Sequence, residues 1–401
     1  MWKLALRNIF RHRSRSALTL GAIAFGVASL IVSSGFVHDF LLQLRESTIH
    51  SQFGHLQLFK LGYTKFGNRS PYEFMIEDPG KISALAHIQH VADVTPRLNF
   101  SALLSNGRTS YPVIGEGVDP GKEKHLSHFM KFIAGTHLAD KDPFTVIIGQ
   151  GVSAALKVTI GDSVLLLVNT RGGALNTFDF RVVGIFQTHS KEFDDRAVRI
   201  PLSSAKDLLA TQAVHSLVFS LQDTDRTDEV ALELMQRLPQ SQFEVKTWYE
   251  LADFYQKTVD LYRRYFLVLY LIILGLVLLG VANSVNMTLY ERIGEFGTLK
   301  ALGNRGGRIF RLILSEIFLL GAIGGGAGVL LGGALAAAIS AVGIPMPPMP
   351  NTNVGYTAHV AFIPAEAVKS LFIGMMGTVG AGIWPARRAV KIGVVEALRH
   401  N

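Results

Sequence analysis

The residues that could bind a nucleotide phosphate are two Gly-Lys pairs, at 80–81 and 121–122. A phosphate-binding loop also needs an upstream Gly, for a backbone that cradles the phosphates, and a Ser or Thr after the Lys to hold Mg²⁺. Both pairs lack these residues, so ATP hydrolysis by this route is excluded. The sequence also has no G-x-S-x-G turn for a nucleophilic serine and no H-E-x-x-H helix for zinc. We therefore predict no catalytic residues.

Two histidine pairs could bind a metal ion. His87/His90 and His125/His128 are spaced i, i+3, which can bring two imidazoles together on a helix. Neither pair has a third ligand nearby in the sequence, and Cys is absent from the whole chain. We predict that these histidines are surface residues and that the chain has no metal site.

Glu316 is a carboxylate inside an apolar run, where an ionisable group is costly and often functional. One interpretation is a functional carboxylate. The other is an ion pair with Arg311, little more than one helical turn away, or with a basic residue of another helix. The structural interpretation is favoured, because Glu316 lies near the end of the run.

The chain that carries these residues is unusually apolar. Its 401 residues are 49% hydrophobic, with a mean hydropathy of +0.30. Four runs reach the roughly 20 residues that cross a bilayer as a helix. They are 16–37, 265–287, 312–342 and 364–383. The first exceeds the roughly 7–15 apolar residues of a signal peptide, so we predict an uncleaved anchor.

Basic residues flank these runs unevenly. Lys and Arg gather in 1–15, 288–311 and 384–401, whereas 343–363 has neither. The positive-inside rule therefore places these three segments in the cytoplasm, and 38–264 and 343–363 outside. Segment 38–264 holds 24 Lys or Arg against 26 Asp or Glu, so the net charge of +8 belongs to the flanks and does not indicate nucleic acid. The flanking basic residues are Lys3, Arg7, Arg11, Arg13, Arg15, Arg292, Lys300, Arg305, Arg308, Arg311, Arg387, Arg388, Lys391 and Arg399.

Residues 1–15 have the pattern of an interfacial amphipathic helix. Trp2, Leu6 and Ile9 recur at helical spacing, while Lys3 and Arg7 mark another face. The alternative is a basic flank that happens to be helical. Both interpretations place the segment at the cytoplasmic surface.

The external segment 38–264 is predicted to be mixed α and β and to consist of two subdomains. A helix at 248–262 is predicted to run directly into the second span, and 169–177 to form a hairpin tip. The predicted strands are 55–59, 111–115, 163–168, 178–186, 197–201, 216–221 and 243–247, and the predicted helices are 80–87, 149–156, 203–209 and 226–238.

The third apolar run contains glycines at helical spacing. Gly321, Gly325, Gly328 and Gly332 recur every three or four residues, which lets helix backbones approach closely. We expect this stripe to pack helices, and it would suit an interface between two copies of the chain.

Several segments together resemble permeases of the MacB/FtsX/LolC–LolE group of ABC transporters. They are WKLALRNIFR at 2–11, IGQG at 148–151, VTIGD at 158–162, RIPL at 199–202, ERIGEFGTLKALG at 291–303, PARRA at 385–389 and VEALR at 395–399. The resemblance covers nearly the whole chain. It implies a bacterial inner-membrane protein with four transmembrane α-helices and a large mixed α/β periplasmic domain inserted between helices 1 and 2.

The resemblance also implies a site and partners. Segment 291–303 would form the short coupling helix that docks into an ATPase subunit, through Glu291, Arg292, Glu295, Phe296, Leu299, Lys300, Ala301, Leu302 and Gly303. ATP and Mg²⁺ would be bound by two copies of that separate subunit, and this chain would bind no cofactor. It would act with a second permease copy, identical or paralogous, by mechanotransmission through the second span.

The substrate stays open. Lipoprotein release fits the length and the spacing of the spans, but segment 169–177 is short and lacks proline, unlike a loop that engages a periplasmic carrier. MacB-like efflux of antibiotics or peptides and FtsX-like signalling to a periplasmic partner are the alternatives, and an enzyme acting at the membrane is a distant third. Membrane lipids, a lipoprotein, or a periplasmic adaptor or carrier are the further expected partners.

Overall fold

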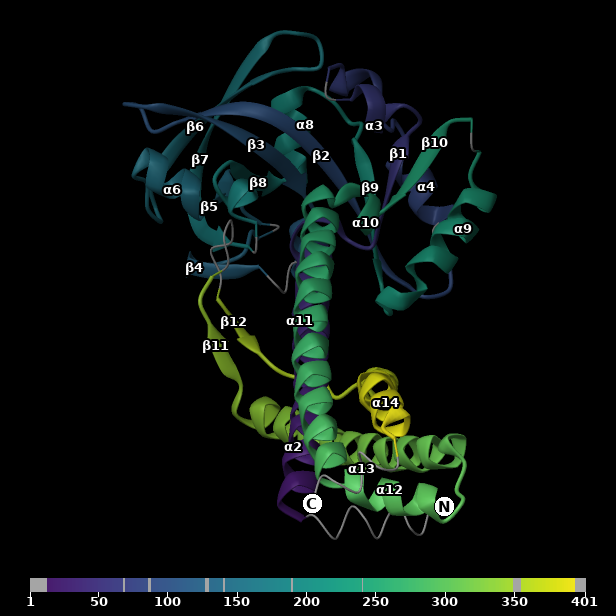
Figure 1. The fold of residues 1–401 in the computed structure, drawn as a ribbon. Helices are drawn as coiled ribbons and strands as arrows, with labels where there is room; N and C mark the ends of the chain where they lie inside the picture. Colours follow the sequence, from purple (N-terminus) through teal and green to yellow (C-terminus); the bar gives the residue numbers. More distant parts are fainter. Residues whose placement is uncertain are drawn as a thin grey trace. The chain divides into compact units, whose positions relative to one another are not determined.

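The computed structural model describes residues 13–67, 69–85, 88–126, 130–139, 141–188, 190–239, 241–348 and 355–393 (Figure 1). Residues 1–12 of the expected amphipathic helix and residues 394–401 of the expected tail lie outside this description. The chain divides into two compact units. We call Met1–Leu41, Val259–Pro345 and Thr357–Asn401 the helical unit, and Leu42–Thr258 with Met346–Tyr356 the sheet unit.

The helical unit is built from long apolar helices. Within the described residues, four helices are long and apolar enough to cross a membrane, and each predicted span lies inside one of them. They are α2 (Arg13–Thr48), α11 (Asp253–Glu291), α13 (Gly306–Val342) and α14 (Pro364–Lys391). A short helix, α12 (Ile293–Ala301), joins α11 to α13. Each long helix extends beyond its apolar run, because helical hydrogen bonding continues where the side chains become polar.

The helix predicted at 248–262 is interrupted. A one-turn helix, α10 (Trp248–Leu251), ends at Ala252, whose ψ of 66° is not helical, and α11 begins at Asp253. Thr247 and Glu250 form a capping box, which starts α10 as a separate helix. Trp248 is buried together with Ile49 and Ala252, so this turn is held by its own small core. The prediction of one continuous helix is therefore wrong at Ala252.

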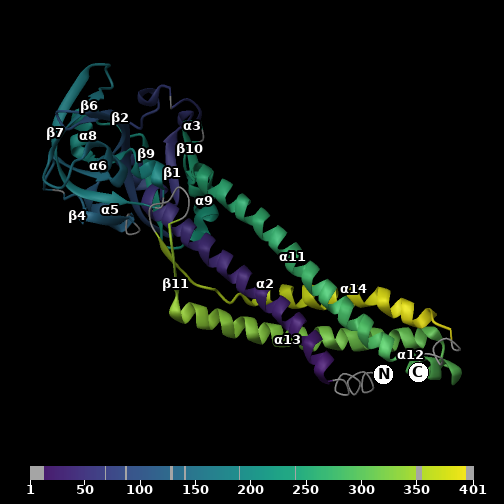
Figure 2. The same cartoon turned by 60° about the vertical axis from the view of Figure 1, so that its left-hand side comes forward.

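The four predicted glycines pack α13 against its neighbours in the same chain. A Cβ on Gly325 would lie 2.6 Å from Leu371 Cδ1 of α14, and one on Gly321 would lie 3.3 Å from Thr378 Cβ. A Cβ on Gly328 would lie 2.7 Å from the carbonyl oxygen of Ala24 in α2, and one on Gly332 would lie 3.1 Å from Ala28 Cα. Figure 2 shows α13 beside α14 and crossed by α2.

All four glycines are buried within the protomer. The expectation that they form an interface between two copies is corrected: α2 and α14 of the same chain already occupy this surface.

Adding a methyl group at Gly328 tests this packing. Gly328→Ala should destabilise the chain by about 1–3 kcal/mol, because the new Cβ overlaps the backbone of α2. Gly326→Ala is the matched control, since a Cβ there meets nothing within 4 Å, and it should be neutral or stabilise by up to about 1 kcal/mol. Thermal unfolding in detergent measures both, and equal effects would contradict the packing described.

The sheet unit contains one ten-stranded mixed sheet in the order β10-β1-β9-β2-β3-β8-β5-β7-β4, with β6 paired to β2 and β7 (Figure 1). The pairs β3–β8 and β5–β7 are parallel. The strands are β1 (Leu56–Lys60), β2 (Val91–Ser105), β3 (Ser110–Val118), β4 (Lys131–Gly135), β5 (Thr145–Gly149), β6 (Ser163–Asn169), β7 (Leu175–Gln187), β8 (Ala197–Pro201), β9 (Ser216–Leu221) and β10 (Phe243–Thr247).

Short helices flank this sheet. They are α3 (Tyr63–Phe66), α4 (Pro79–Leu85), α5 (Pro120–Leu126), α6 (Gln150–Leu156), α7 (Lys191–Asp194), α8 (Leu202–Leu209) and α9 (Thr227–Arg237). A π-helical turn, η1 (Ile49–Phe53), follows α2, and 3-10 turns occur at η2 (Pro71–Glu73) and η3 (Thr224–Arg226). Two further short strands, β11 (Ile344–Met346) and β12 (Tyr356–Ala358), pair with each other.

All seven predicted strands are present, and the tip between β6 and β7 is a hairpin as predicted, with Asn169 paired to Leu175. The four predicted helices correspond to α4, α6, α8 and α9. The sequence prediction missed β2, β4 and β5. The first part of β2 pairs with β9, and from Leu98 onward it pairs with β3. Two large core clusters lie on these two halves of the sheet. The whole region forms one compact unit, and its division into two subdomains stays a prediction.

His215 is a buried titratable group of this unit. Its side chain has no solvent exposure, and its Nδ1 accepts a hydrogen bond from the Asn99 backbone N–H at 3.1 Å. The rings of Tyr63 and Tyr72 lie beside it. Burial lowers the pKa of His215 to about 4. The folded protein therefore holds this imidazole neutral.

Stability should fall as the pH drops from about 6.5 to about 4, because the unfolded chain takes up a proton at His215 that the folded chain refuses. The full contribution of this group is about 3 kcal/mol. Chemical unfolding of the chain at several pH values in this window measures it. His215→Asn should flatten the slope while leaving the contribution of His55, whose pKa burial also lowers to about 4. An unchanged slope would contradict this assignment.

Candidate functional site

The predicted coupling segment forms α12, a short helix with one buried and one exposed face. Ile293, Phe296 and Gly297 are buried, at the i, i+3, i+4 spacing of a single helix face. Leu302, directly after the helix, is 76% exposed. The other exposed residues of the segment are Glu291, Glu295, Thr298, Ala301 and Gly303. One face thus fixes the helix to the chain, and the other is available to a partner.

Arg292, between α11 and α12, fixes the start of this helix. It is 6% exposed, and its Nη1 donates to Glu316 Oε2 of α13 at 2.7 Å. Its Nε donates to Glu295 Oε2 at 2.9 Å, and its guanidinium lies 5.2 Å from the ring centroid of Phe296. Glu316 is 8% exposed, so this is a buried, charge-assisted hydrogen bond. The prediction that Glu316 forms an ion pair is confirmed. Its partner is Arg292, a basic residue of another segment, and not Arg311.

Lys300 fixes the other end of α12. Its Nζ donates to the backbone carbonyl oxygens of Val390 and Ile392, at 2.6 and 2.7 Å. These residues form the end of α14, where the last carbonyls of a helix lack intrahelical partners and the macrodipole is negative. Lys300 therefore caps α14 from α12.

Gly303 ends α12. Its φ is +84°, its N–H donates to the Lys300 carbonyl, and the Asn304 N–H donates to the Leu299 carbonyl. This pattern of two bonds is a Schellman motif, in which Gly avoids the strain of a left-handed residue. Sequence reasoning selected Gly303 as a partner contact, and the structure gives it this backbone role.

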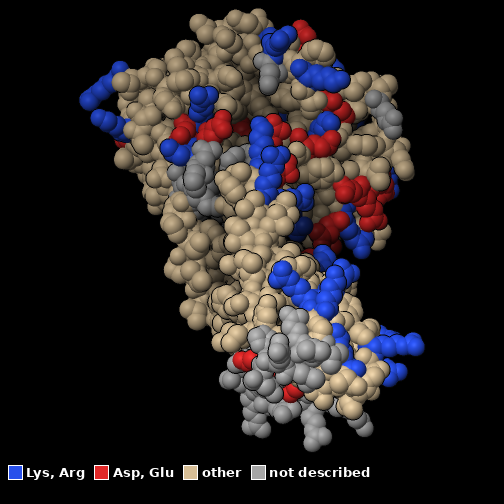
Figure 3. Space-filling model, viewed as in Figure 1, with Lys and Arg blue, Asp and Glu red and all other residues tan. Residues whose placement is uncertain are grey.

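Exposed basic side chains surround α12. Figure 3 shows the helical unit largely uncharged along its length, with Lys and Arg gathered toward the end that carries α12. Among the described residues, Arg305, Arg308, Arg311, Arg387, Arg388 and Lys391 are the exposed basic residues near this end.

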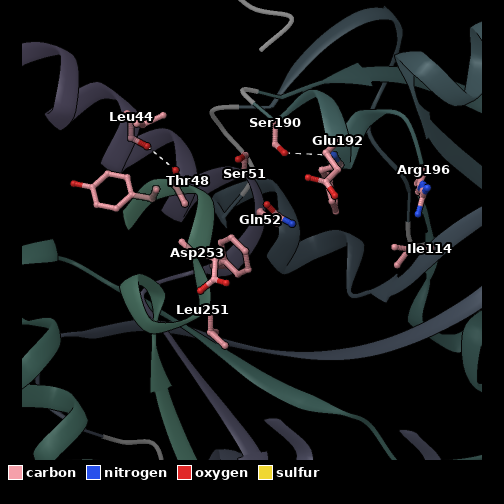
Figure 4. A pocket seen from close by; sticks show the side chains of 14 residues that line it. Leu44, Thr48, Ser51, Gln52, Ile114, Ser190, Glu192, Arg196, Leu251 and Asp253 are labelled. Atoms are coloured by element: carbon pink, nitrogen blue, oxygen red, sulfur yellow. Dashed lines mark hydrogen bonds between the residues drawn. The ribbon is translucent and has the colours of Figure 1, made fainter. Parts of the chain in front are cut away.

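The sheet unit contains a hollow of about 320 Å³ (Figure 4). One wall is made by the end of α2 and by η1, with Leu44, Thr48 and Gln52, and another by Leu251 and Asp253 around the start of α11. The opposite wall comes from β3 and from the region of α7, with Ile114, Ser190, Glu192 and Arg196. The lining mixes apolar side chains, such as those of Leu44 and Leu251, with polar and charged ones, among them Glu192, Arg196 and Asp253.

The histidines considered as metal ligands lie in the sheet unit. The described residues contain no group of three His, Cys, Asp or Glu that could hold a metal ion. His90 makes a hydrogen bond with Arg226 through Nε2, at 2.7 Å. His87 and the side chains of His125 and His128 lie outside the description, so the metal prediction is not tested at these positions.

A buried ionic cluster that sequence reasoning missed stands beside the hollow. Arg199 is fully buried and donates to Glu116 at 2.7 Å, to Glu123 at 3.0 Å and to the Ser51 carbonyl of η1 at 3.0 Å. Arg97 adds a salt bridge to Glu123 at 3.3 Å. The cluster joins β2, β3, α5 and β8 to η1. Its signal in the sequence was Arg199 within the family-like RIPL stretch, since a charged residue in a buried strand needs a partner.

Removing one partner of this cluster should be costly. Arg199→Met leaves two buried carboxylates short of a donor, and we expect a loss of about 3–5 kcal/mol. Arg181→Met is the control, because Arg181 pairs with Asp142 at the surface at 2.8 Å, where such a pair contributes about 0–1 kcal/mol. Chemical unfolding measures both variants. A loss at Arg199 no larger than that at Arg181 would contradict the role of the cluster.

The chain matches two families and several proteins. The MacB-like periplasmic core domain matches residues 16–237, and the FtsX-like permease C-terminal domain matches residues 267–394. An uncharacterized ABC transporter permease of Methanocaldococcus jannaschii is 23% identical over 98% of this chain and 96% of its own length. The lipoprotein-releasing system transmembrane protein LolC of Xylella fastidiosa is also 23% identical, over the same shares of both chains.

The macrolide export ATP-binding/permease protein MacB of Sodalis glossinidius is 27% identical over 98% of this chain, which spans 60% of that protein's length. The first family match alone covers more than half of the chain, and the second covers α12 and most of the long helices around it. The resemblance expected from the sequence is thereby confirmed, and the chain belongs to the family of ABC transporter permeases that carry a MacB-like periplasmic core domain followed by an FtsX-like permease domain.

Proposed function

We propose that this chain is the permease subunit of an ABC transporter, and that α12 docks on an ATPase subunit held on a separate chain. ATP binding and hydrolysis in that subunit would move α12, and the movement would change the conformation of the sheet unit. The chain itself would be non-catalytic and bind no cofactor, with ATP and Mg²⁺ in two copies of the partner.

The observation that carries this proposal is the two-sided construction of α12. Its inner face is fixed by Arg292 and Lys300, while Glu295, Thr298 and Leu302 are exposed. A docking element needs this combination, because a helix that moved freely could not transmit a push. A separate ATPase is supported by two relatives that match over 96% of their own length and are named as a permease and as a transmembrane protein.

The membrane arrangement rests on the four apolar helices and on the charges at their ends. We assign 16–37, 265–287, 312–342 and 364–383 as transmembrane segments of a bacterial inner membrane. The exposed Arg and Lys around α12 support a cytoplasmic position for this end, and hence for both termini. The sheet unit would then be periplasmic.

A second permease copy is part of the proposal, because α11 leaves an apolar face uncovered. In its most apolar window only 6% of residues are buried within the chain. Leu267, Leu271 and Leu276 are each 60–66% exposed. Lipid and a second copy are the two chemical environments that suit such a face.

The substrate is proposed to be a lipoprotein released or exported from the membrane, in line with the relatives named LolC and LolE. Export of a small molecule is the alternative that relatives named for macrolide and pyoverdine export support. An FtsX-like signalling role, with no transported substrate, is the third. ATP turnover by the reconstituted complex distinguishes the three roles. Stimulation by a lipoprotein supports lipoprotein release, stimulation by a macrolide supports small-molecule export, and stimulation by neither supports signalling.

Introducing a negative charge on the exposed side of the α12 segment tests whether the ATPase subunit docks there. Leu302→Asp should weaken binding of the ATPase subunit by about tenfold or more, because the few residues that dominate an interface each contribute about 2 kcal/mol or more. The ATPase that copurifies with the tagged full-length chain from membranes is the measurement.

Leu232→Asp is the matched control, because Leu232 is a 61% exposed leucine of α9 in the sheet unit. This variant should copurify the ATPase as the unaltered chain does. Copurification that Leu302→Asp leaves unchanged would overturn docking on α12, and no ATPase with the unaltered chain would overturn the proposed function.

A further inference from the structure

A shallow groove lies between α11 and α14 where both helices reach α12. Its lining includes Asn286 and Tyr290 of α11, Pro385 and Arg388 of α14, and Ile293 of α12. The hollow has a volume of about 30 Å³, so a ligand would lie across the groove and not inside it. Among the described residues that line it, Arg388 is the single charged side chain. The groove therefore favours an anion.

Arg388 is oriented by an aromatic ring. Its guanidinium carbon lies 4.0 Å from the ring centroid of Trp384, one helical turn earlier, in a cation–π contact. Both side chains are at the surface, and Trp384 is 57% exposed. Within the described part of the chain Arg388 forms no salt bridge, whereas Arg292 pairs with two glutamates. The planar guanidinium of Arg388 is thus held in place and available to a phosphate, which it can bind through two hydrogen bonds.

Two more cations stand beside Arg388 at the end of α14. Arg387 precedes it, and Lys391 follows it by three residues, which places Lys391 on the same side of the helix. Both are exposed, and the described residues provide neither with an acidic partner. Like charges this close together repel one another, and an anion bound among them relieves the repulsion.

An exposed apolar row leads along α14 to this cationic end. Val368, Phe372 and Met376 recur every fourth residue and are 66%, 58% and 53% exposed. Trp384 and Arg388 continue the same row. An apolar row that ends in a cation matches a molecule with an apolar chain and an anionic head. A soluble phosphate would use only the last of these side chains, so the row favours a phospholipid.

The level of the groove also suits a lipid headgroup. The second and fourth apolar runs end at residues 287 and 383, so Tyr290 and Trp384 follow them closely. Both aromatic side chains are exposed, at 60% and 57%. Trp and Tyr gather where the acyl chains of a bilayer give way to headgroups. In the proposed membrane arrangement, the cations of the groove therefore lie at the depth of the phosphates of the cytoplasmic leaflet, where basic pockets between helices bind anionic headgroups.

We propose that the groove between α11 and α14 is a binding site for an anionic phospholipid of the cytoplasmic leaflet. Arg388 binds the phosphate, Trp384 supports the guanidinium, and Arg387 and Lys391 add positive charge. An acyl chain lies along the apolar row of α14. The inference rests on the membrane arrangement of the proposed function and goes beyond it, because one lipid becomes a specific ligand. Ile293 of α12 lines the same groove, so the bound lipid contacts the segment proposed to dock the ATPase.

Trp384 itself can report the bound lipid, because bromine atoms on an acyl chain quench tryptophan fluorescence on contact. The chain has three tryptophans. Trp2→Phe removes one, and Trp248 is buried in the sheet unit at 6% exposure, where it gives a constant background. The full-length chain, without ATPase, is reconstituted in vesicles of phosphatidylcholine and phosphatidylglycerol in varied proportions, with one of the two lipids brominated. The two series give the binding constant of the anionic lipid relative to that of the neutral lipid.

The site predicts that phosphatidylglycerol binds beside Trp384 about fivefold more tightly than phosphatidylcholine, or better. Arg388→Gln should bring this ratio close to one, because it removes the phosphate ligand. Arg308→Gln is the matched control. Arg308 is an exposed cation of α13 at the same end, without a salt bridge to any described residue, and it does not line the groove. Its replacement should leave the ratio unchanged.

A ratio near one in the unaltered chain would overturn the lipid site. If Arg388→Gln then lowers the amount of ATPase that copurifies with the chain, the cations belong to a protein interface instead. Equal losses in Arg388→Gln and Arg308→Gln would indicate attraction by the whole basic end, which would also overturn a site in the groove. Failure of the membrane arrangement gives a different result, because neither brominated lipid would then quench Trp384.

Discussion

The buried ion pair between Arg292 and Glu316 is the constraint on which the helical unit depends. A carboxylate in an apolar helix is costly unless a cation neutralises it, and Glu316 finds that cation in a different segment, at 2.7 Å. Because Arg292 must enter the helical unit to meet it, the chain has to turn between α11 and α12. The turn directs α12 across the ends of α13 and α14, where Lys300 reaches the last carbonyls of α14. The position of the exposed face of α12 follows from these contacts.

In the sheet unit, two buried arginines that pair with glutamates have a comparable role. Arg97 and Arg199 bind Glu116 and Glu123, and both also donate to carbonyls of the π-helical turn η1. Trp248 packs against Ile49 of the same turn. The two chain segments that enter the sheet unit, after α2 and before α11, are thus joined to each other and to the sheet. In both units, paired charges in apolar surroundings hold the element that a partner or a neighbouring segment would move.

Local patterns sufficed to predict the elements whose side chains repeat regularly. Apolar runs of membrane-spanning length predicted α2, α11, α13 and α14, and β-branched or alternating residues predicted strands such as β8 and β9. Strand β2 was missed because Pro96, Arg97 and Asn99 interrupt its apolar pattern, and because β9, the partner of its first half, lies far away in the sequence. The interruption at Ala252 was missed because a helical pattern gives no warning of a neighbouring core around Trp248.

The candidate site could be predicted from the sequence only in part, because its contacts join segments that are distant in the sequence. Segment 291–303, and the short helix α12 within it, could be predicted through the resemblance to a family. The partners of Arg292 and Lys300 come from α13 and α14, so no local pattern could assign them. Arg311, the nearest basic residue in the sequence, was a natural candidate for Glu316, yet Arg292 occupies that position. Gly328 and Gly332 likewise had a visible spacing, whereas their contact with α2 required the fold.

The central claim is that ATP acting at α12 changes the sheet unit. Hydrogen–deuterium exchange of the full-length chain, in complex with its ATPase and with or without a non-hydrolysable ATP analogue, tests it most directly. The account predicts that exchange changes together in α12 and in η1, the turn held by Arg97 and Arg199. A change confined to α12, with η1 and the strands around it unaffected, would contradict it.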